Sequence, residues 1–178
     1  RKTELNYLDG KFNGLQSYWN SNGNKVQEKN YINGKQQGLW TLYYQETGIK
    51  KEETNYIDGV QEGLWTEWYE DGQKRRERNF KDGERDSTWT TWYKNGNKKF
   101  LASYSYGKLN GKYIRWYEDG IIKELDGEYL NNKKHKKWIY WSKNGQKTEE
   151  INYNNGVHHG SHIKWFGEKS DQHKKFHI

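Results

Sequence analysis

The chain has 178 residues, of which 30% are hydrophobic and 31% are charged, and its mean hydropathy is −1.46. This polarity excludes a thick aliphatic core, and no apolar run approaches the ~20 residues of a membrane-spanning helix. The absence of Cys excludes a disulfide framework and thiolate chemistry. Aromatic residues make up 17% of the chain, and because each ring can bury a large area, they argue against disorder. We therefore expect a thin structure held by aromatic contacts and backbone hydrogen bonds.

The net charge of +7 is unevenly distributed. Residues 1–89 hold 14 Lys and Arg against 15 Asp and Glu, whereas residues 90–178 hold 17 against 9. Any electrostatic preference for a partner is therefore expected in the C-terminal half. The simplest interpretation of this excess is a solvated, lysine-rich surface.

An aromatic anchor recurs every 24 or 25 residues along the whole chain. Counted from the anchor, Gly occupies positions 3 and 7, an aromatic residue position 9, an aromatic pair positions 12 and 13, and an Asp-Gly or Asn-Gly turn ends near position 16. The segment Asn55–Arg78 shows the full pattern. A fixed period predicts a repeat array, here one domain over residues 1–178. The anchors are Tyr7, Tyr31, Tyr56, Phe80, Tyr104, Tyr129 and Tyr153.

Most of the 19 glycines directly follow Asn or Asp, for example in Asp58-Gly59 and Asp71-Gly72. Such pairs suit the positive φ angles of tight hairpin turns. The runs between them are rich in Thr, Trp and Tyr and lack a helical period. The sequence therefore predicts an all-β fold: an elongated, twisted meander of about seven β-hairpin repeats in a single layer.

Alternation along a strand places the rings at positions 9 and 13 on one face and the ring at position 12 on the other. Position 9 carries a ring except at Gln16 and His162, which suit the polar ends of an array. Position 12 is aromatic in every repeat, and we predict that it forms a packed structural ladder. Its members are Trp19, Tyr43, Trp68, Trp92, Trp116, Trp141 and Trp165.

The pattern Tyr-x-x-Gly-x-x-x-Gly-x-Trp-x-x-Trp-Tyr-x-x-Gly strongly resembles the MORN repeat (membrane occupation and recognition nexus), and most closely its bacterial variant. Members of that variant group are often labelled toxin–antitoxin proteins. The resemblance covers essentially the whole chain and implies a non-enzymatic hairpin scaffold that binds proteins and, in some members, lipids. The choline-binding cell-wall repeat is an alternative, but its Gly-Trp start fits the double-Gly spacing poorly.

Two repeats depart from the glycine pattern. Ser87 replaces the second Gly of the fourth repeat, and Asn132 and Lys136 replace both glycines of the sixth. We expect the chain to turn less tightly at these positions, because Gly adopts positive φ more readily than other residues.

Lys133, Lys134, Lys136 and Lys137 form the densest basic run, which we expect on the hairpin loop of the sixth repeat. A solvated loop is the simplest interpretation, and a patch for an anionic partner is the functional one. Trp65, Trp89 and Trp138 are the candidate partner-binding rings on the position 9 face. Nucleic acid is disfavoured, since rings at these positions recur throughout and packing explains them.

Five of the six histidines lie near the C-terminus: His158, His159, His162, His173 and His177. His158 and His162 are four apart, a spacing that suits a metal on a helix but not on a strand, and we predict no metal site. No nucleophile–base group, phosphate loop or carboxylate pair departs from the repeat background. We therefore expect neither a cofactor nor an enzyme.

The favoured function is a protein-binding scaffold, in its specific form an antitoxin or immunity protein. The alternative is an exported or cell-surface protein that binds glycan, wall polymer or anionic lipid. The sequence begins with Arg1, so we expect that a preceding segment was removed, by signal peptidase or by truncation. Processing would favour an extracytoplasmic location, and an antitoxin role a cytoplasmic one.

Overall fold

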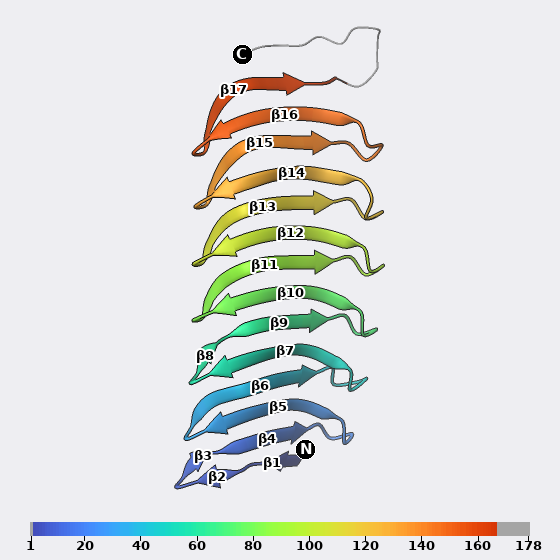
Figure 1. The fold of residues 1–178 in the computed structure, drawn as a ribbon. Helices are drawn as coiled ribbons and strands as arrows, with labels where there is room; N and C mark the ends of the chain where they lie inside the picture. The colour runs from blue at the N-terminus through green and yellow to red at the C-terminus, as the bar shows by residue number, and fades with distance from the viewer. Residues whose placement is uncertain (1, 167–178) are drawn as a thin grey trace. The chain divides into compact units, whose positions relative to one another are not determined.

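A computed structural model describes residues 2–166, and all regular secondary structure in this range is β-strand (Figure 1). Consecutive strands pair antiparallel as hairpins, which confirms the predicted all-β meander. Packing divides the chain into two compact units, Arg1–Ser87 and Thr88–Ile178, and each is described by itself. The boundary lies within strand β11 (Glu84–Trp92).

The first unit is an antiparallel meander in which β1, β4, β5, β6, β7, β9 and β10 follow one another in space. The short strands β2 and β3 pair with each other, and β8 pairs with β7. The strands are β1 (Lys2–Glu4), β2 (Tyr7–Leu8), β3 (Lys11–Phe12), β4 (Gly14–Trp19), β5 (Lys25–Ile32), β6 (Lys35–Tyr43), β7 (Lys50–Ile57), β8 (Val60–Gln61), β9 (Gly63–Trp68) and β10 (Lys74–Lys81).

The second unit continues the same plan, with each strand paired to the next along the chain. Its complete strands are β12 (Lys98–Ser105), β13 (Lys108–Trp116), β14 (Lys123–Leu130), β15 (Lys133–Trp141), β16 (Lys147–Asn154) and β17 (Val157–Lys164). The register shifts in every one of these pairs, as at Arg115/Trp116 between β13 and β14, so bulges recur with the repeat.

The tight turns have the geometry that their residues predict. Asp58 and Gly59 both have positive φ, at 50° and 87°, between β7 and β8. Two consecutive residues with positive φ match the twist of the flanking strands, which is why Asp-Gly and Asn-Gly are favoured there.

The three replacements of glycine do not loosen the backbone, so that prediction was wrong. Ser87, Asn132 and Lys136 have φ values of 55°, 65° and 57°, in the same left-handed region as Gly63 at 78°. Around Lys136 the reason is visible, because β15 is hydrogen-bonded to β14 on one side and to β16 on the other. The paired strands fix the backbone, and the residue accepts the resulting strain.

This strain predicts a stabilising substitution. We expect Ser87→Gly to raise the free energy of unfolding by about 1 kcal/mol, because a residue with a Cβ pays roughly 1–2 kcal/mol in the left-handed region. The greater freedom of Gly in the unfolded chain offsets part of this gain. Gly63→Ser, the reverse change at the same repeat position, should lower stability by a similar amount. Chemical denaturation of both variants tests the prediction, and a destabilised Ser87→Gly would contradict it.

The two faces of the sheet carry different rings. On one face, called the anchor face here, Trp40 packs against Tyr31 and Tyr56 with ring centroids 5.5 and 4.9 Å apart. In the second unit, Trp138 packs in the same way against Tyr129 at 5.0 Å and Tyr153 at 6.3 Å. Anchors and position 9 rings therefore alternate in a stack that holds successive repeats together.

Position 12 lies on the opposite face, three residues along the strand from position 9. Position 13 directly follows the strand, which ends at position 12. The position 13 hydroxyl of Tyr44 donates to the backbone carbonyl of Trp68, one repeat ahead, at 2.8 Å. Tyr117 donates in the same way to Trp141, also at 2.8 Å. Each of these tyrosines ties its own repeat to the next one.

Candidate functional site

The basic run Lys133 to Lys137 does not form a loop, and that prediction was wrong. It lies within β15, whose register pairs Lys134 with Tyr129 on β14 and Lys136 with Tyr153 on β16. The sequence signal was misleading because the two glycines that mark a hairpin are absent here. Asn132 and Lys136 nevertheless adopt the glycine conformation, so the hairpin forms without them.

The lysines of this run do not form one uniform basic patch. Lys136 pairs with Glu128 at 2.7 Å and Lys137 with Glu150 at 2.6 Å. The Lys134 ammonium lies 4.4 Å from the ring centroid of Trp138 and donates to the Tyr140 hydroxyl at 3.0 Å. Burial opposes its charge, but the interactions with Tyr140 and Tyr153 together outweigh burial and raise the pKa of Lys134. Three of the four charges therefore already have internal contacts, and Lys133 remains exposed.

The candidate rings at position 9 are more buried than a binding surface requires. Trp138 is 1% exposed and Trp65 is 7% exposed, whereas every ring of the position 12 ladder is half-buried. Trp89 is half-buried and packs against Tyr104 with centroids 4.7 Å apart. Buried indoles offer a partner little surface, so Trp65 and Trp138 act in packing.

Trp138 is covered because the neighbouring strand has no side chain at Gly127. A Cβ built on Gly127 would lie 2.3 Å from Cδ2 of the indole. The indole thus rests on bare backbone, and its Nε1 donates to the carbonyl of Glu128 at 3.1 Å. At Trp138, the residue two before the anchor therefore allows the ring at position 9 to be deeply buried.

On the opposite face, Glu28 joins Lys25 and Tyr43. The carboxylate accepts from the Lys25 ammonium at 2.5 Å and from the Tyr43 hydroxyl at 2.6 Å. Burial opposes the charge of Glu28, but these two bonds outweigh it and lower its pKa. For Tyr43, burial and the bond to Glu28 act together and raise the pKa to about 12. Lys50–Glu53, Lys74–Glu77, Lys123–Asp126 and Lys147–Glu150 repeat the ion pair.

Ionisation of the Tyr43 hydroxyl should lower the free energy of unfolding in alkaline solution. Its pKa in the folded state, about 12, exceeds the ordinary value of 10.0, so its contribution is complete below pH 10 and is lost as the pH rises to 12. We expect Tyr43→Phe to make the free energy of unfolding depend less steeply on pH in this window. Tyr106→Phe is the control, since that side chain is 79% exposed. Equal slopes for wild type and Tyr43→Phe would contradict the assignment.

The C-terminal histidines fall into two groups. In the described part, His162 Nε2 lies 2.7 Å from the Glu149 carboxylate, and its ring centroid lies 5.7 Å from that of His158. His173 and His177 lie outside the described residues. Within residues 2–166, no three His, Cys, Asp or Glu side chains form a group that could hold a metal ion.

Sequence reasoning missed an exposed aliphatic stripe on the opposite face of the first unit. Its five side chains are between 46% and 56% exposed and come from positions 1 and 8 of successive repeats. The register places Leu15 beside Asn30 and Leu39 beside Asn55, so they share the face opposite the anchors. Position 8 in the second unit carries Thr88, Lys112, Lys137 and Ser161 instead. The stripe consists of Leu15, Ile32, Leu39, Ile57 and Leu64.

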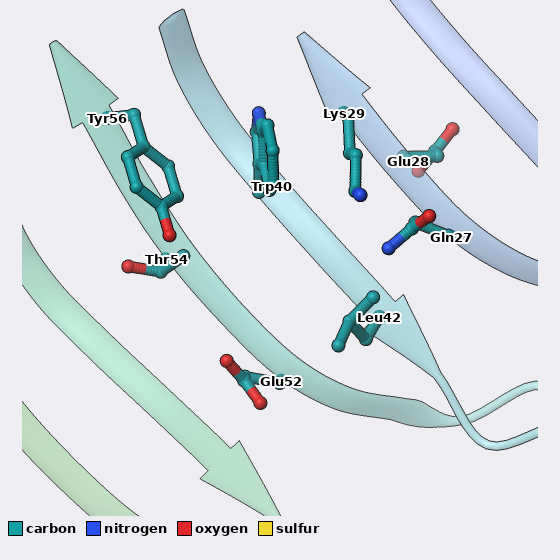
Figure 2. A pocket seen from close by; sticks show the side chains of 8 residues that line it. All are labelled: Gln27, Glu28, Lys29, Trp40, Leu42, Glu52, Thr54 and Tyr56. Atoms are coloured by element: carbon teal, nitrogen blue, oxygen red, sulfur yellow. The ribbon is translucent and has the colours of Figure 1, made fainter. Parts of the chain in front are cut away.

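Sequence reasoning also missed a pocket on the anchor face of the first unit, formed by β5, β6 and β7 (Figure 2). The pocket has a volume of about 190 Å³. Its signal in the sequence is the short Thr54, which stands two residues before an anchor. The lining residues are Gln27, Glu28, Lys29, Trp40, Leu42, Glu52, Thr54 and Tyr56.

Comparison with protein families identifies most of the chain. The model described as the MORN repeat variant matches residues 12–33, 61–82, 85–106, 109–131 and 134–155. Each matched segment starts within a strand, runs through the next anchor and ends at the first residue of the tight turn that follows that anchor. A comparison with curated proteins gave no match. No helix in residues 2–166 is long and apolar enough to cross a membrane.

Proposed function

Since the chain belongs to the MORN repeat variant family, whose repeats commonly bind proteins or lipids, we propose that it is a non-enzymatic scaffold that binds a protein partner through the aliphatic stripe. The observation that carries this proposal is the half-exposure of five aliphatic side chains on one face of the first unit. Exposed apolar side chains that gather on one face often mark an interaction site.

The spacing of the stripe suits an ordered partner. Leu15, Leu39 and Leu64 lie on β4, β6 and β9, which alternate with the intervening strands β5 and β7. Two strand spacings of ~4.8 Å place successive leucines ~9.6 Å apart. Ile32 and Ile57 fill the diagonal positions between them. The stripe thus presents a row of regularly spaced apolar contacts that crosses the strands.

Charge favours a protein over an anionic lipid as the occupant of this surface. Residues 1–87 hold 14 Lys and Arg against 15 Asp and Glu, so the first unit has no basic excess. Association with an anionic membrane relies on clusters of Lys and Arg. The apolar stripe within a balanced charge field is instead typical of the centre of a protein interface.

A bacterial antitoxin or immunity protein is one specific form of this function, with a toxin as the partner. The alternative, an exported or cell-surface protein that binds glycan, wall polymer or anionic lipid, has less support. Stacking on a sugar needs an open ring face, and the position 9 rings pack between anchors. Some of the half-buried rings at position 12 are covered by lysines. For example, the Lys2 ammonium lies 4.6 Å from the ring centroid of Trp19.

The test compares partner capture by two variants of the whole chain. Leu15→Ser, Leu39→Ser and Leu64→Ser together remove the apolar row, and exposed changes of this kind usually alter stability by about 0.5 kcal/mol or less each. Lys108→Ser with Lys112→Ser is the control, on exposed side chains of the second unit. We expect the leucine variant to lose a protein that wild type and control retain. Retention of the same proteins by all three would refute the proposed surface.

A further inference from the structure

The pocket on the anchor face lies on the side of the sheet opposite the aliphatic stripe. Most of its side chains come from two rows of paired residues on three adjacent strands: Trp40 stands between Lys29 and Thr54, and Leu42 stands between Gln27 and Glu52. Trp40 and Tyr56 form an aromatic wall, with centroids 4.9 Å apart, and Leu42 lies further along β6 (Figure 2). Thr54 is the shortest side chain among the lining residues.

Lys29 is the one cation among the lining residues, and it has no acidic partner in the part of the chain that the structure describes. Its ammonium lies 4.5 Å from the ring centroid of Trp40. Burial alone lowers the pKa of Lys29, since no neighbouring anion compensates for the lost water. By contrast, Lys25 on the same strand is paired with Glu28 at 2.5 Å. A half-buried, unpaired ammonium at the rim of a pocket favours an anionic group.

Three other polar groups of the pocket have unused donors. The side-chain amide of Gln27 and the hydroxyl of Tyr56 make no hydrogen bond within the described residues. Thr54 Oγ1 accepts from Gln61 at 2.7 Å, which leaves its own proton to donate. Glu28 also lines the pocket, but its carboxylate accepts from Lys25 and Tyr43 on the opposite face. Glu52 carries the remaining charge, and one of its oxygens already accepts from the indole of Trp65 at 2.7 Å. It lies two residues along β7 from Thr54, toward Leu42, which leaves the Lys29 end to an anion.

A sugar fits this pocket poorly. Stacking on a sugar requires an open ring face, and Trp40 already contacts Tyr31, Tyr56 and the Lys29 ammonium. The volume of about 190 Å³ suits a small group or a single side chain. An acceptor-only group with two oxygens, a carboxylate, matches the unused donors best.

The pocket differs from the corresponding places in the second unit. Lys29 stands two residues before its anchor. In the second unit this position is occupied by Ala102, Gly127 and Ile151, all of which are buried. Five of its eight lining residues fall within residues 34–60, between the first two segments that match the family model. Packing of the repeat does not require an unpaired lysine here.

We propose that this pocket binds a carboxylate, with the Lys29 ammonium as its counter-ion and Gln27, Thr54 and Tyr56 as hydrogen-bond donors. The carboxylate belongs either to a small free acid or to an acidic side chain of a peptide. The site is independent of the protein-binding surface proposed above, because it occupies the other face of the sheet. Either proposal can therefore fail while the other stands.

The test is an NMR titration of the whole chain that follows the indole N–H of Trp40. The probes are N-acetylglutamate methylamide, the matched neutral N-acetylglutamine methylamide, and the free acids propionate and succinate. We expect at least one carboxylate to shift the Trp40 signal with millimolar affinity and the neutral amide to leave it unchanged. Binding of the capped glutamate alone identifies a peptide source, and binding of the free acids alone a small-molecule source.

Three variants define the role of Lys29. Lys29→Met should weaken carboxylate binding at least tenfold, while Lys29→Arg, which keeps the charge, should retain it. Lys51→Met is the matched control, because Lys51 also lies over a ring, that of Tyr44 at 5.7 Å, but outside the pocket. Unchanged spectra away from the pocket verify that each variant folds. Equal binding of the neutral amide, full binding by Lys29→Met, or no shift with any carboxylate would each overturn the proposal.

Discussion

Trp138→Ala is expected to be the most damaging of the single substitutions, lowering the free energy of unfolding by about 4 kcal/mol. The indole is 1% exposed, and its ring centroid lies 5.0 Å from that of Tyr129 and 5.7 Å from that of Tyr113. Its removal leaves a cavity in the middle of the ring stack. It also deprives the Glu128 carbonyl of the donor that now lies 3.1 Å away.

Trp141→Ala is the matched control for this prediction, because Trp141 belongs to the same strand but lies on the opposite face. It is half-buried, so we expect it to cost about 2 kcal/mol, and the same holds for Trp68→Ala and Trp92→Ala. Urea denaturation of the two β15 variants gives the comparison. A larger loss for Trp141→Ala than for Trp138→Ala would mean that the position 12 ladder, and not the anchor-face stack, carries the stability of the sheet.

Gly127→Ala is expected to cost about 3 kcal/mol, which is large for the addition of one methyl group. The new Cβ would lie 2.3 Å from Cδ2 and 2.4 Å from Cε2 of Trp138, so either the indole or the strand must move. Gly127 has no left-handed backbone, and the expected effect is therefore one of packing rather than of conformation.

A double-mutant cycle separates these two causes. In the Trp138→Ala background the clash is absent, so Gly127→Ala should change stability by only about 0.5 kcal/mol, which gives a coupling of 2–3 kcal/mol. Additive effects in the cycle would show that Gly127→Ala destabilises the protein through backbone conformation and not through contact with Trp138. The cycle needs only the melting or denaturation curves of four proteins, and the half-buried Trp141 again supplies the control partner.

The family match and the fold agree with what the sequence predicts, for a physical reason. Anchors every 24 or 25 residues and Asp-Gly or Asn-Gly turns are local signals, and a hairpin depends on only a few consecutive residues. The separation of position 9 from position 12 likewise follows from alternation within one strand. The all-β meander could therefore be read without knowing which strand lies beside which.

The sites depend on cross-strand neighbours, and only the tertiary structure determines those. The burial of Trp138 is decided by Gly127, eleven residues earlier, and the pocket at Trp40 by Lys29 and Thr54 on the strands to either side. Bulges shift the register between these strands, so spacing along the chain does not give the pairs. The prediction that the basic run Lys133 to Lys137 lies in a loop was wrong for a related reason. Pairing on both sides of β15 forces Lys136 into the conformation of the glycine that it replaces, because the ladder outweighs the preference of a single residue.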